Sequence, residues 1–413
     1  MNISFLVKRW SEINPEKTAI ICEGDAISYA ALNSRVERTA CWLLSLGIEK
    51  GDRVAIMLKN SPEFIDLYLA CSRLGVIFVP INFRSAEAEL VYFLENCDPR
   101  LFVFGSEFED RVKEAGIKDT MPRLLLCSLG KTANHEEFLD FNLETGAFDG
   151  HRPGIEASKG PSDPEEAHVI MYTSGTTGKP KGAVLSHRKT FFNCLNADIF
   201  FRLDFDDIML IVLPLFHSGG LFIQATPALY KGATMIIHPR FDPRKACEDI
   251  QKYMVTKFLG VPTVYKSLLQ AWKAEEPALS SLKICAIGGE KVTPELITQF
   301  RDMGLPLRHV MGQTETSILL WASEDEVLRK PGSVGRPVFH SQVAILNKQG
   351  RPCKPGEIGE IVVRGTIMMK EYWRDPERTR ETIRNGWLHT GDLAKMDEEG
   401  FYYLVDRAKD MYI

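Results

Sequence analysis

The sequence lacks the long apolar run that a membrane-spanning helix needs. Its longest apolar stretch, residues 208–216, is interrupted by Pro214 and is far shorter than the roughly 20 residues of a spanning helix. The apolar run around Phe5 near the N-terminus is too short for the core of a signal peptide. We therefore expect a soluble protein without a transmembrane segment.

Paired cysteines and a basic excess are also absent. The 9 cysteines include no C-x-x-C pair and are odd in number, which favours a reducing, cytoplasmic setting. Lys and Arg total 50 against 55 Asp and Glu, a formal net charge of −5. A nucleic-acid-binding surface usually shows a basic excess, so we expect a cytoplasmic protein with no nucleic-acid partner.

Strand-like apolar runs alternate with helix-like segments along most of the 413 residues, which favours α/β architecture with parallel, helix-flanked sheets. At about 150 residues per domain, this length predicts two or three compact units. We expect one α/β layer in residues 1–165 and a second in residues 166–331. From Gly332 onward, short β-type runs separated by Gly and Pro predict a small antiparallel β subdomain up to residue 405.

A segment rich in Gly, Ser, Thr and Lys follows the strand expected at residues 169–172. Glycines let a backbone approach a ligand closely, while hydroxyls and lysines offer donors and positive charge, a chemistry suited to phosphates. The Walker A spacing is absent, and Pro180 interrupts any helix after Gly178. A flexible linker is the alternative, although linkers rarely lie between two apolar runs. The residues concerned are Thr173, Ser174, Gly175, Thr176, Thr177, Gly178, Lys179 and Lys181.

This segment resembles the phosphate loop of the adenylate-forming (AMP-binding) superfamily, which includes acyl-CoA synthetases, adenylation domains of peptide synthetases and beetle luciferases. Four further segments are similar to the superfamily's motifs and follow in the same order. They are residues 214–220 (PLFHSGG), 312–315 (GQTE), 387–393 (WLHTGDL) and 406–410 (DRAKD). The resemblance spans nearly the whole chain and is closest to the acyl-CoA synthetase, or fatty-acid–CoA ligase, branch.

The resemblance implies that residues 1–405 form the large N-terminal AMP-binding domain, with two α/β layers and a distorted β barrel. Residues 406–413 would then be the hinge, with Lys409 at the rotation point. The mobile C-terminal lid of the superfamily, which carries a catalytic lysine, is absent from these residues. We therefore expect this chain to bind ATP and an acid but to adenylate the acid weakly.

The resemblance also implies the roles of the residues around the phosphates. The loop 173–181 would hold the β- and γ-phosphates of ATP, Thr314 would donate to a phosphate oxygen, and Glu315 would be the oxygen ligand of Mg²⁺. Asp392 and Arg407 would contact the ribose. Without the resemblance, a Thr-Glu pair is more often a helix start, an Asp in T-G-D a turn residue, and Arg407 a solvated charge.

The adenine and acyl pocket is implied by the same resemblance. Most members carry a Tyr that stacks on adenine where this chain has Met311, a flexible thioether. His217 would be the gate of the acyl tunnel, although a core histidine is the alternative. Without the resemblance, the pair Gly288–Gly289 could also be a simple strand-to-helix turn. The remaining residues implied at the nucleotide are Gly288, Gly289, Glu290, Gly312 and Gln313.

The same motifs narrow the acid. Amino-acid-activating members usually place an Asp in the motif that here reads PLFHSGG, which contains no carboxylate. Malonate-activating members have an Arg where this chain has Val310, so a second carboxylate there would be buried unpaired at a high desolvation cost. We expect an apolar monocarboxylic acid, aliphatic or aromatic, with a fatty acid favoured.

The expected reaction joins this acid to CoA through an acyl-AMP intermediate, with ATP, Mg²⁺ and CoA taking part. Two alternatives remain open. The acyl group could pass to a carrier-protein thiol, or the chain could be a nucleotide-binding module without catalysis. The sequence leaves the oligomeric state undecided, and a homodimer is among the options.

Overall fold

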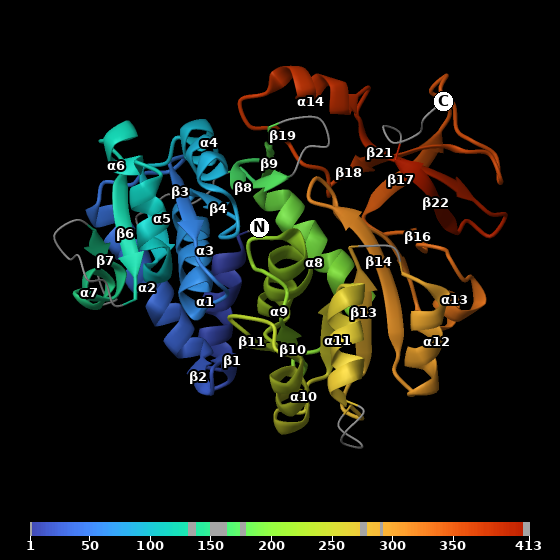
Figure 1. The fold of residues 1–413 in the computed structure, drawn as a ribbon, viewed down its shortest axis with the longest axis horizontal. Coiled ribbons are helices and arrows are strands. Elements are labelled where there is room, and N and C mark those ends of the chain that lie inside the picture. The colour runs from blue at the N-terminus through green and yellow to red at the C-terminus, as the bar shows by residue number, and fades with distance from the viewer. Residues whose placement is uncertain are drawn as a thin grey trace.

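Two large β-sheets and one smaller sheet organise the chain in the computed structural model (Figure 1). The structure describes residues 2–130, 138–148, 163–173, 179–272, 279–289 and 292–407. In Figure 1 the chain runs from blue elements on one side, through the green helices α8 and α9 in the middle, to the orange and red strands on the other side.

The eight-stranded sheet is parallel at its centre, where β3 pairs with β4 and β5, and β4 pairs with β8. Strand β9 turns back antiparallel to β8, and the two-residue strand β19 adds antiparallel to β9. The strand order is β19 (Glu371–Tyr372), β9 (Lys181–Ser186), β8 (Ala167–Thr173), β4 (Ile77–Pro80), β3 (Arg53–Met57), β5 (Leu101–Gly105), β6 (Leu125–Leu129) and β7 (Leu139–Asp140).

The nine-stranded sheet has parallel pairing from β1 through β11, β10, β12 and β13 to β14, and antiparallel strands at its edges. Its parallel strands are almost wholly buried, as expected for strands covered on both faces. The order is β16 (Arg336–Pro337), β15 (Ser317–Ala322), β14 (Leu307–Gln313), β13 (Ile284–Gly288), β12 (Lys257–Gly260), β10 (Ile208–Ile211), β11 (Thr234–Ile237), β1 (Thr18–Cys22) and β2 (Asp25–Ser28).

The five-stranded sheet is antiparallel and comes from the C-terminal part of the described chain. Its strands lie within the range 332–407, but the predicted β subdomain 332–405 is not one sheet, because two short strands of that range, residues 336–337 and 371–372, join the two large sheets. Its strands are β17 (Ser341–Leu346), β18 (Gly359–Gly365), β21 (Trp387–Met396) and β20 (Ile383–Arg384), with β22 (Tyr402–Arg407) paired to β21.

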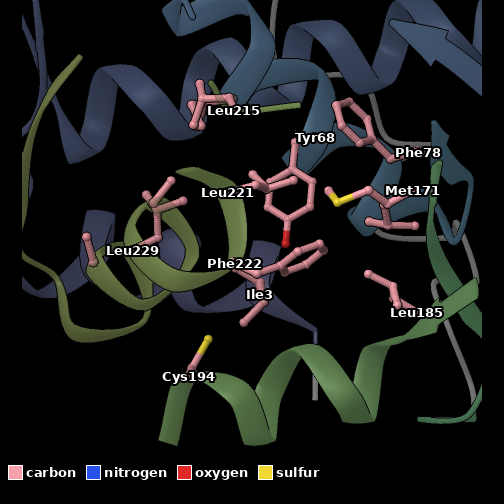
Figure 2. Close-up of a cluster of buried hydrophobic side chains, with 14 of the residues drawn as sticks. Ile3, Tyr68, Phe78, Met171, Leu185, Cys194, Leu215, Leu221, Phe222 and Leu229 are labelled. Atoms are coloured by element: carbon pink, nitrogen blue, oxygen red, sulfur yellow. The ribbon is translucent and has the colours of Figure 1, made fainter. Parts of the chain in front are cut away.

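Helices fill the space between the two large sheets and cover their outer faces. The largest buried cluster takes side chains from both sheets and from α1 (Ile3–Ile13), α2 (Tyr29–Ser45), α3 (Pro62–Leu74), α8 (His187–Phe201), the π-helix η2 (Gly219–Ala225) and α9 (Thr226–Lys231). Figure 2 shows part of this cluster, with Tyr68 of α3, Cys194 of α8 and Phe222 of η2 facing a common interior.

Two further buried clusters lie under the outer helices. One packs the nine-stranded sheet against α10 (Pro243–Lys252), α11 (Pro262–Trp272), α12 (Pro294–Asp302) and α13 (Glu324–Arg329). The other packs the eight-stranded sheet against α4 (Glu87–Cys97), η1 (Ser106–Phe108), α5 (Glu109–Glu114) and α6 (Ile117–Thr120). The remaining helices are α7 (Phe141–Gly146) and α14 (Pro376–Thr382). None of the helices in the described ranges combines the length and the hydropathy that crossing a bilayer requires.

Helix ends follow from local sequence signals. Helix α3 begins after Ser61, whose hydroxyl accepts from the Phe64 amide at 3.3 Å, and has Pro62 in its first turn. It ends at Gly75, whose φ of 71° is the left-handed conformation that glycine adopts without strain. Helix α8 begins in the same way, because the Ser186 hydroxyl accepts from the Lys189 amide at 3.2 Å.

The α/β fold class is confirmed, but the expected division at residue 165 does not match the division between the sheets. Strand β1 joins the nine-stranded sheet by pairing Ile20 with Met235, while β8 and β9 belong to the eight-stranded sheet. Long-range contacts such as the hydrogen bond from the Tyr29 hydroxyl to the Ala233 carbonyl, 2.8 Å, hold the N-terminal segment there. Apolar periodicity identifies strands but not the partners with which they pair.

Candidate active site

The GQTE segment forms a tight turn between β14 and β15. The Thr316 amide donates to the Gln313 carbonyl at 3.0 Å, and Thr314 lies half-buried in the turn. A Cβ at Gly312 would lie 1.7 Å from the Ser317 carbonyl oxygen, so this close approach requires glycine. Ser317 itself has a φ of 57°, a left-handed conformation that is uncommon for a residue with a side chain.

Glu315 is buried and is held by Tyr372, whose hydroxyl donates to Glu315 Oε1 at 2.8 Å. Burial, together with the charge of Glu315, raises the pKa of Tyr372 above its usual range, so the hydroxyl keeps its proton and remains a donor. Tyr372 lies in β19 opposite Ala183 of β9, and the Lys181 Nζ lies 5.1 Å from the centroid of its ring. Tyr372 thus links Glu315 to the base of the predicted phosphate loop.

The two ends of that loop meet across the β8–β9 hairpin. Thr173 pairs with Lys181 in the register, and the Thr173 hydroxyl donates to the Lys181 carbonyl at 3.5 Å. Lys179 is exposed, with its Nζ 5.3 Å from the ring centroid of Tyr92. A cavity of about 250 Å³ adjoins these residues, with Lys179, Lys181 and Tyr372 in its lining. The predicted phosphate-binding residues Ser174, Gly175, Thr176, Thr177 and Gly178 lie outside the described residues.

The TGD segment is brought to the GQTE turn by Gln313. The Gln313 Nε2 donates to Asp392 Oδ2 at 3.4 Å and to the Thr390 carbonyl at 3.3 Å. The Asp392 amide in turn donates to the Thr390 hydroxyl at 3.1 Å, and Gly391 takes a φ of 77°. These contacts place the Asp392 carboxylate beside the end of β14.

The backbone of Arg407 lies directly opposite that of Asp392 in the register of β21 and β22, and its role as a ribose contact stays a prediction. Lys409, the predicted hinge residue, lies outside the described residues.

The Gly288–Gly289 pair ends β13 beside β14. A Cβ at Gly288 would lie 2.1 Å from the Val310 carbonyl oxygen, and Gly289 has a φ of 82°, so both positions favour glycine. Met311 is half-buried and follows the residue that pairs with Gly288. The glycine pair and Met311 therefore share one edge of the sheet, as a pocket wall requires, while Glu290 lies outside the described residues.

His217 lies just before η2, and its side chain reaches solvent. Its ring centroid is 4.3 Å from that of Phe216. Partial removal of the ring from water lowers the pKa of His217, and the positive charge of Arg84 acts in the same direction. The neutral imidazole is therefore favoured at pH 7. No hydrogen bond or ring contact between described residues joins His217 to Glu315, and its role as a gate stays a prediction.

Lys189 is a candidate that the sequence analysis missed. It lies in the first turn of α8, is only 1% exposed, and donates from Nζ to the Ser317 hydroxyl at 2.6 Å. Burial lowers the pKa of Lys189 to about 7, although the negative charge of Glu315 acts in the opposite direction. A lysine near the start of a helix is normally exposed to solvent, and no pattern in the sequence marks Lys189 as buried. Tyr372 was missed for a similar reason, since only the long-range pairing of β9 with β19 places it at Glu315.

The arrangement suits a ligand with several negative charges. Lys181, Glu315 and Asp392 come from segments of three sheets and are connected through Tyr372 and Gln313. Lys179 lines the same cavity as Lys181 and Tyr372. Among the described residues no cluster of three or more His, Cys, Asp or Glu side chains could hold a metal by itself. A single carboxylate nevertheless fits Mg²⁺, which proteins often hold through one or two carboxylates together with water and substrate phosphates.

Comparisons with known proteins show the family of this chain. Residues 7–373 match the family described as AMP-binding enzyme. A feruloyl-CoA synthase of Amycolatopsis sp. is 36% identical over 98% of this chain and 78% of its own length. An indoleacetate–CoA ligase of Aromatoleum aromaticum is 34% identical over 100% of this chain and 80% of its own length.

A solved structure extends the likeness to three dimensions. The O-succinylbenzoate coenzyme A synthetase (MenE) of Bacillus subtilis, in complex with AMP, has a TM-score of 0.86 at 29% identity. The superposition covers 99% of this chain and 79% of that one.

Proposed function

Because this chain belongs to the AMP-binding enzyme family, we propose that it is an ATP-dependent carboxylic acid:CoA ligase that acts through an acyl-AMP intermediate. The observation that carries this proposal is the contact between the motifs. Tyr372 connects Glu315 with the base of the phosphate loop, and Gln313 connects the GQTE turn with Asp392. The relatives named above are CoA ligases, which supports the same reaction class.

In the first half-reaction, a carboxylate oxygen attacks the α-phosphorus of ATP, the bond between the α- and β-phosphates breaks, and pyrophosphate leaves. Two anions approach each other in this step, so the site must supply positive charge and donors. Lys179 and Lys181 supply the charge, and the loop 173–181 and Thr314 supply donors. Glu315 would hold Mg²⁺, whose contribution is to neutralise phosphate charge, and Tyr372 fixes the orientation of that carboxylate.

The nucleotide is held by residues at the edge where β13, β14 and β21 meet. The Asp392 carboxylate accepts from the ribose hydroxyls, and Gln313 keeps this carboxylate beside the turn. Met311 and the glycine pair at 288–289 line the adenine site, together with Glu290, while Arg407 is the second ribose contact. In the second half-reaction, the CoA thiol attacks the acyl carbonyl and AMP leaves.

For the acid, we propose a monocarboxylic acid with a largely apolar body and take a fatty acid as the first candidate. His217 is the gate of its tunnel. The relatives named above act, by their printed names, on feruloyl, indoleacetate and O-succinylbenzoate groups, so aromatic acids belong in any test.

The test measures pyrophosphate release and thioester formation with acetate, hexanoate, palmitate, benzoate and cinnamate, with and without CoA. Binding of ATP and of each acid is measured alongside, so that the weak adenylation expected from the sequence does not hide a substrate. Glu315→Gln and Asp392→Asn test the site, and Glu381→Gln, at an exposed acidic residue, is the matched control.

Acid-dependent pyrophosphate release, with acyl-CoA formed when CoA is present, is the expected result. Pyrophosphate release without acyl-CoA would point to a carrier-protein thiol as acceptor. ATP binding without release for any acid would contradict the proposal and favour a non-catalytic module.

A further inference from the structure

Lys189 is a buried lysine whose ammonium group makes no ion pair with any described carboxylate, although the charge of Glu315 acts on it from a greater distance. Among the described residues no carboxylate lies within 4.0 Å of its Nζ, and its hydrogen-bond partner is the neutral Ser317 hydroxyl at 2.6 Å. An ammonium group has three donors, and burial of an unpaired charge is strongly unfavourable. In the part of the chain that the structure describes, Lys257 is buried to a similar degree, and its Nζ lies 3.5 Å from the Asp207 carboxylate. Lys189 therefore lacks the kind of partner that the fold supplies elsewhere.

The position of this ammonium is defined by two segments that already belong to the candidate site. Ser317 lies two residues after Glu315, at the start of β15. On the other side, the Lys189 Nζ lies 5.5 Å from the ring centroid of Phe222. Phe222 belongs to η2, which begins within the PLFHSGG segment, and in Figure 2 it points into the buried interior above α8. The ammonium thus lies where the segment that follows the GQTE turn approaches η2, which continues from the predicted acyl-pocket segment PLFHSGG.

Asn193, one helical turn after Lys189, confirms which face of α8 meets these segments. Its side chain is fully buried, donates to the Phe222 carbonyl and accepts from the Ile318 amide at 3.4 Å. Asn193 therefore joins the same two segments with both ends of its amide satisfied. Lys189 occupies the equivalent position nearer to Glu315, but with donors left over.

The backbone beneath Ser317 is an independent sign of a built site. Ser317 is almost fully buried and holds a left-handed φ of 57°, and its carbonyl packs directly against Gly312. Strained backbone of this kind persists where the surrounding structure imposes it, and it gathers at ligand sites. The hydroxyl of this residue accepts the hydrogen bond from the Lys189 ammonium at 2.6 Å.

We propose that Lys189 and Ser317 form a polar end of the acyl pocket, and that they bind a hydrogen-bond-accepting oxygen on the body of the acid. This inference rests on the proposed acid:CoA ligase function and narrows its substrate. A carboxylate, a ketone or a phenolic oxygen would each accept from the donors that Lys189 has left. An unsubstituted fatty acid, the first candidate under the proposed function, would leave those donors buried without an acceptor. We therefore expect it to bind less tightly than an acid that carries such an oxygen.

The test uses pairs of acids that differ by one oxygen-bearing group. Suitable pairs are heptanoate with 6-oxoheptanoate, heptanoate with heptanedioate, and cinnamate with 4-hydroxycinnamate. Dissociation constants are measured in the presence of ATP, and pyrophosphate release is measured with the same acids. A hydrogen bond to a charged group corresponds to a tenfold to roughly hundredfold preference, so at least one oxygenated acid should bind that much more tightly than its partner. Which pair responds distinguishes a carboxylate, a ketone and a phenol.

Two variants locate the effect. Lys189→Met keeps the length of the side chain but removes its donors, and should abolish the preference for the oxygenated acid while leaving the ATP dissociation constant within twofold of its original value. Lys348→Met, at an exposed lysine, is the matched control and should keep the preference.

If the apolar acid of every pair binds as tightly as its oxygenated partner, or if Lys189→Met keeps the preference, this inference is overturned while the ligase function stands. If no acid is bound or turned over, the proposed function fails and this inference fails with it. If Lys189→Met does not fold, the dissociation constants of the paired acids for the unsubstituted protein still test this inference.

Discussion

Two polar clusters at the nine-stranded sheet differ in whether the buried lysine of each is paired with a carboxylate. Lys257, at the start of β12, lies 3.5 Å from Asp207, which immediately precedes β10. The Thr256 hydroxyl and the Asp204 amide also donate to the Asp207 carboxylate, each at 2.7 Å. Around Glu315, by contrast, the buried Lys189 ammonium has a neutral partner, Ser317.

The positions of the two clusters explain this difference. Asp207 and Lys257 lie at the amino ends of parallel strands, whereas Glu315 follows the carboxyl end of β14. In open α/β sheets, ligands bind outside the carboxyl ends of the strands. At the amino ends, Lys257 and Asp207 form an ion pair that holds strands together. At the carboxyl ends, the Lys189 ammonium has donors that no carboxylate accepts from, and these donors are available to a ligand. Substitutions in the Asp207–Lys257 cluster should therefore mainly lower the free energy of unfolding. Substitutions around Glu315 should mainly change pyrophosphate release.

The largest effect is expected for Asp207→Ala. This change leaves Lys257 buried without its carboxylate partner and should lower the free energy of unfolding by about 3 to 5 kcal/mol. Urea-induced unfolding followed by circular dichroism measures the change. A loss below about 1 kcal/mol, the usual range for an exposed pair, would show that this buried ion pair does not hold the strands together.

Glu315→Gln should show the reverse behaviour. Loss of this carboxylate should reduce acid-dependent pyrophosphate release by about 100-fold or more, in the range seen when one preorganised electrostatic group is removed from a site. The free energy of unfolding should change far less than in Asp207→Ala. Equal pyrophosphate release by Glu315→Gln and by the Glu381→Gln control would contradict the assignment of the site.

Lys189→Met should stabilise the protein without substrate, by about 2 kcal/mol at pH 7, because it replaces an unpaired buried charge with an apolar side chain of similar length. The gain should depend on pH. The pKa of Lys189 in the folded protein is about 7, below the usual 10.5, so the unfolded chain binds the extra proton between these two values. The destabilising contribution of Lys189 is therefore complete below pH 7 and fades as the pH rises towards 10.5.

Unfolding of the unsubstituted protein and of Lys189→Met at pH 7 and pH 9 measures this dependence. The difference between them should shrink at the higher pH. A difference that grows from pH 7 to pH 9 would show that Lys189 carries a favourable charge interaction within the apo fold.

The smallest effect is expected for Tyr372→Phe, which removes the hydroxyl that donates to Glu315 at 2.8 Å. Loss of one hydrogen bond to a carboxylate should reduce pyrophosphate release by about tenfold, since about 1.4 kcal/mol corresponds to a factor of ten. The apparent Mg²⁺ requirement should rise as well, because Glu315 loses its fixed orientation. Unchanged kinetics would mean that the contact is not needed to position Glu315.

The sequence could predict the α/β fold class and the residues that carry the motifs. Lys181, Gly288, Glu315 and Asp392 were identified because each belongs to a short segment whose residue types and order are distinctive. The structure then places Glu315 and Asp392 within one connected arrangement. The predictions for residues 174–178, Glu290 and Lys409 concern positions outside the described residues and stay predictions.

The missed features depend on contacts between distant segments. Periodicity could not show that β1 and β2 join the nine-stranded sheet, because pairing partners are set by tertiary packing. Tyr372 reaches Glu315 only through the pairing of β19 with β9. Lys189 was missed because a lysine in the first turn of a helix is normally solvated, and its burial arises from the approach of η2 and β15 to α8.

Exchange of labelled pyrophosphate into ATP measures whether this chain joins a carboxylic acid to AMP. Purified protein, ATP, Mg²⁺ and labelled pyrophosphate are incubated with and without each acid of the panel. We expect label in ATP only when a suitable acid is present, and we expect Glu315→Gln to lose this labelling. If ATP binds but stays unlabelled with every acid, the chain does not form an acyl-AMP.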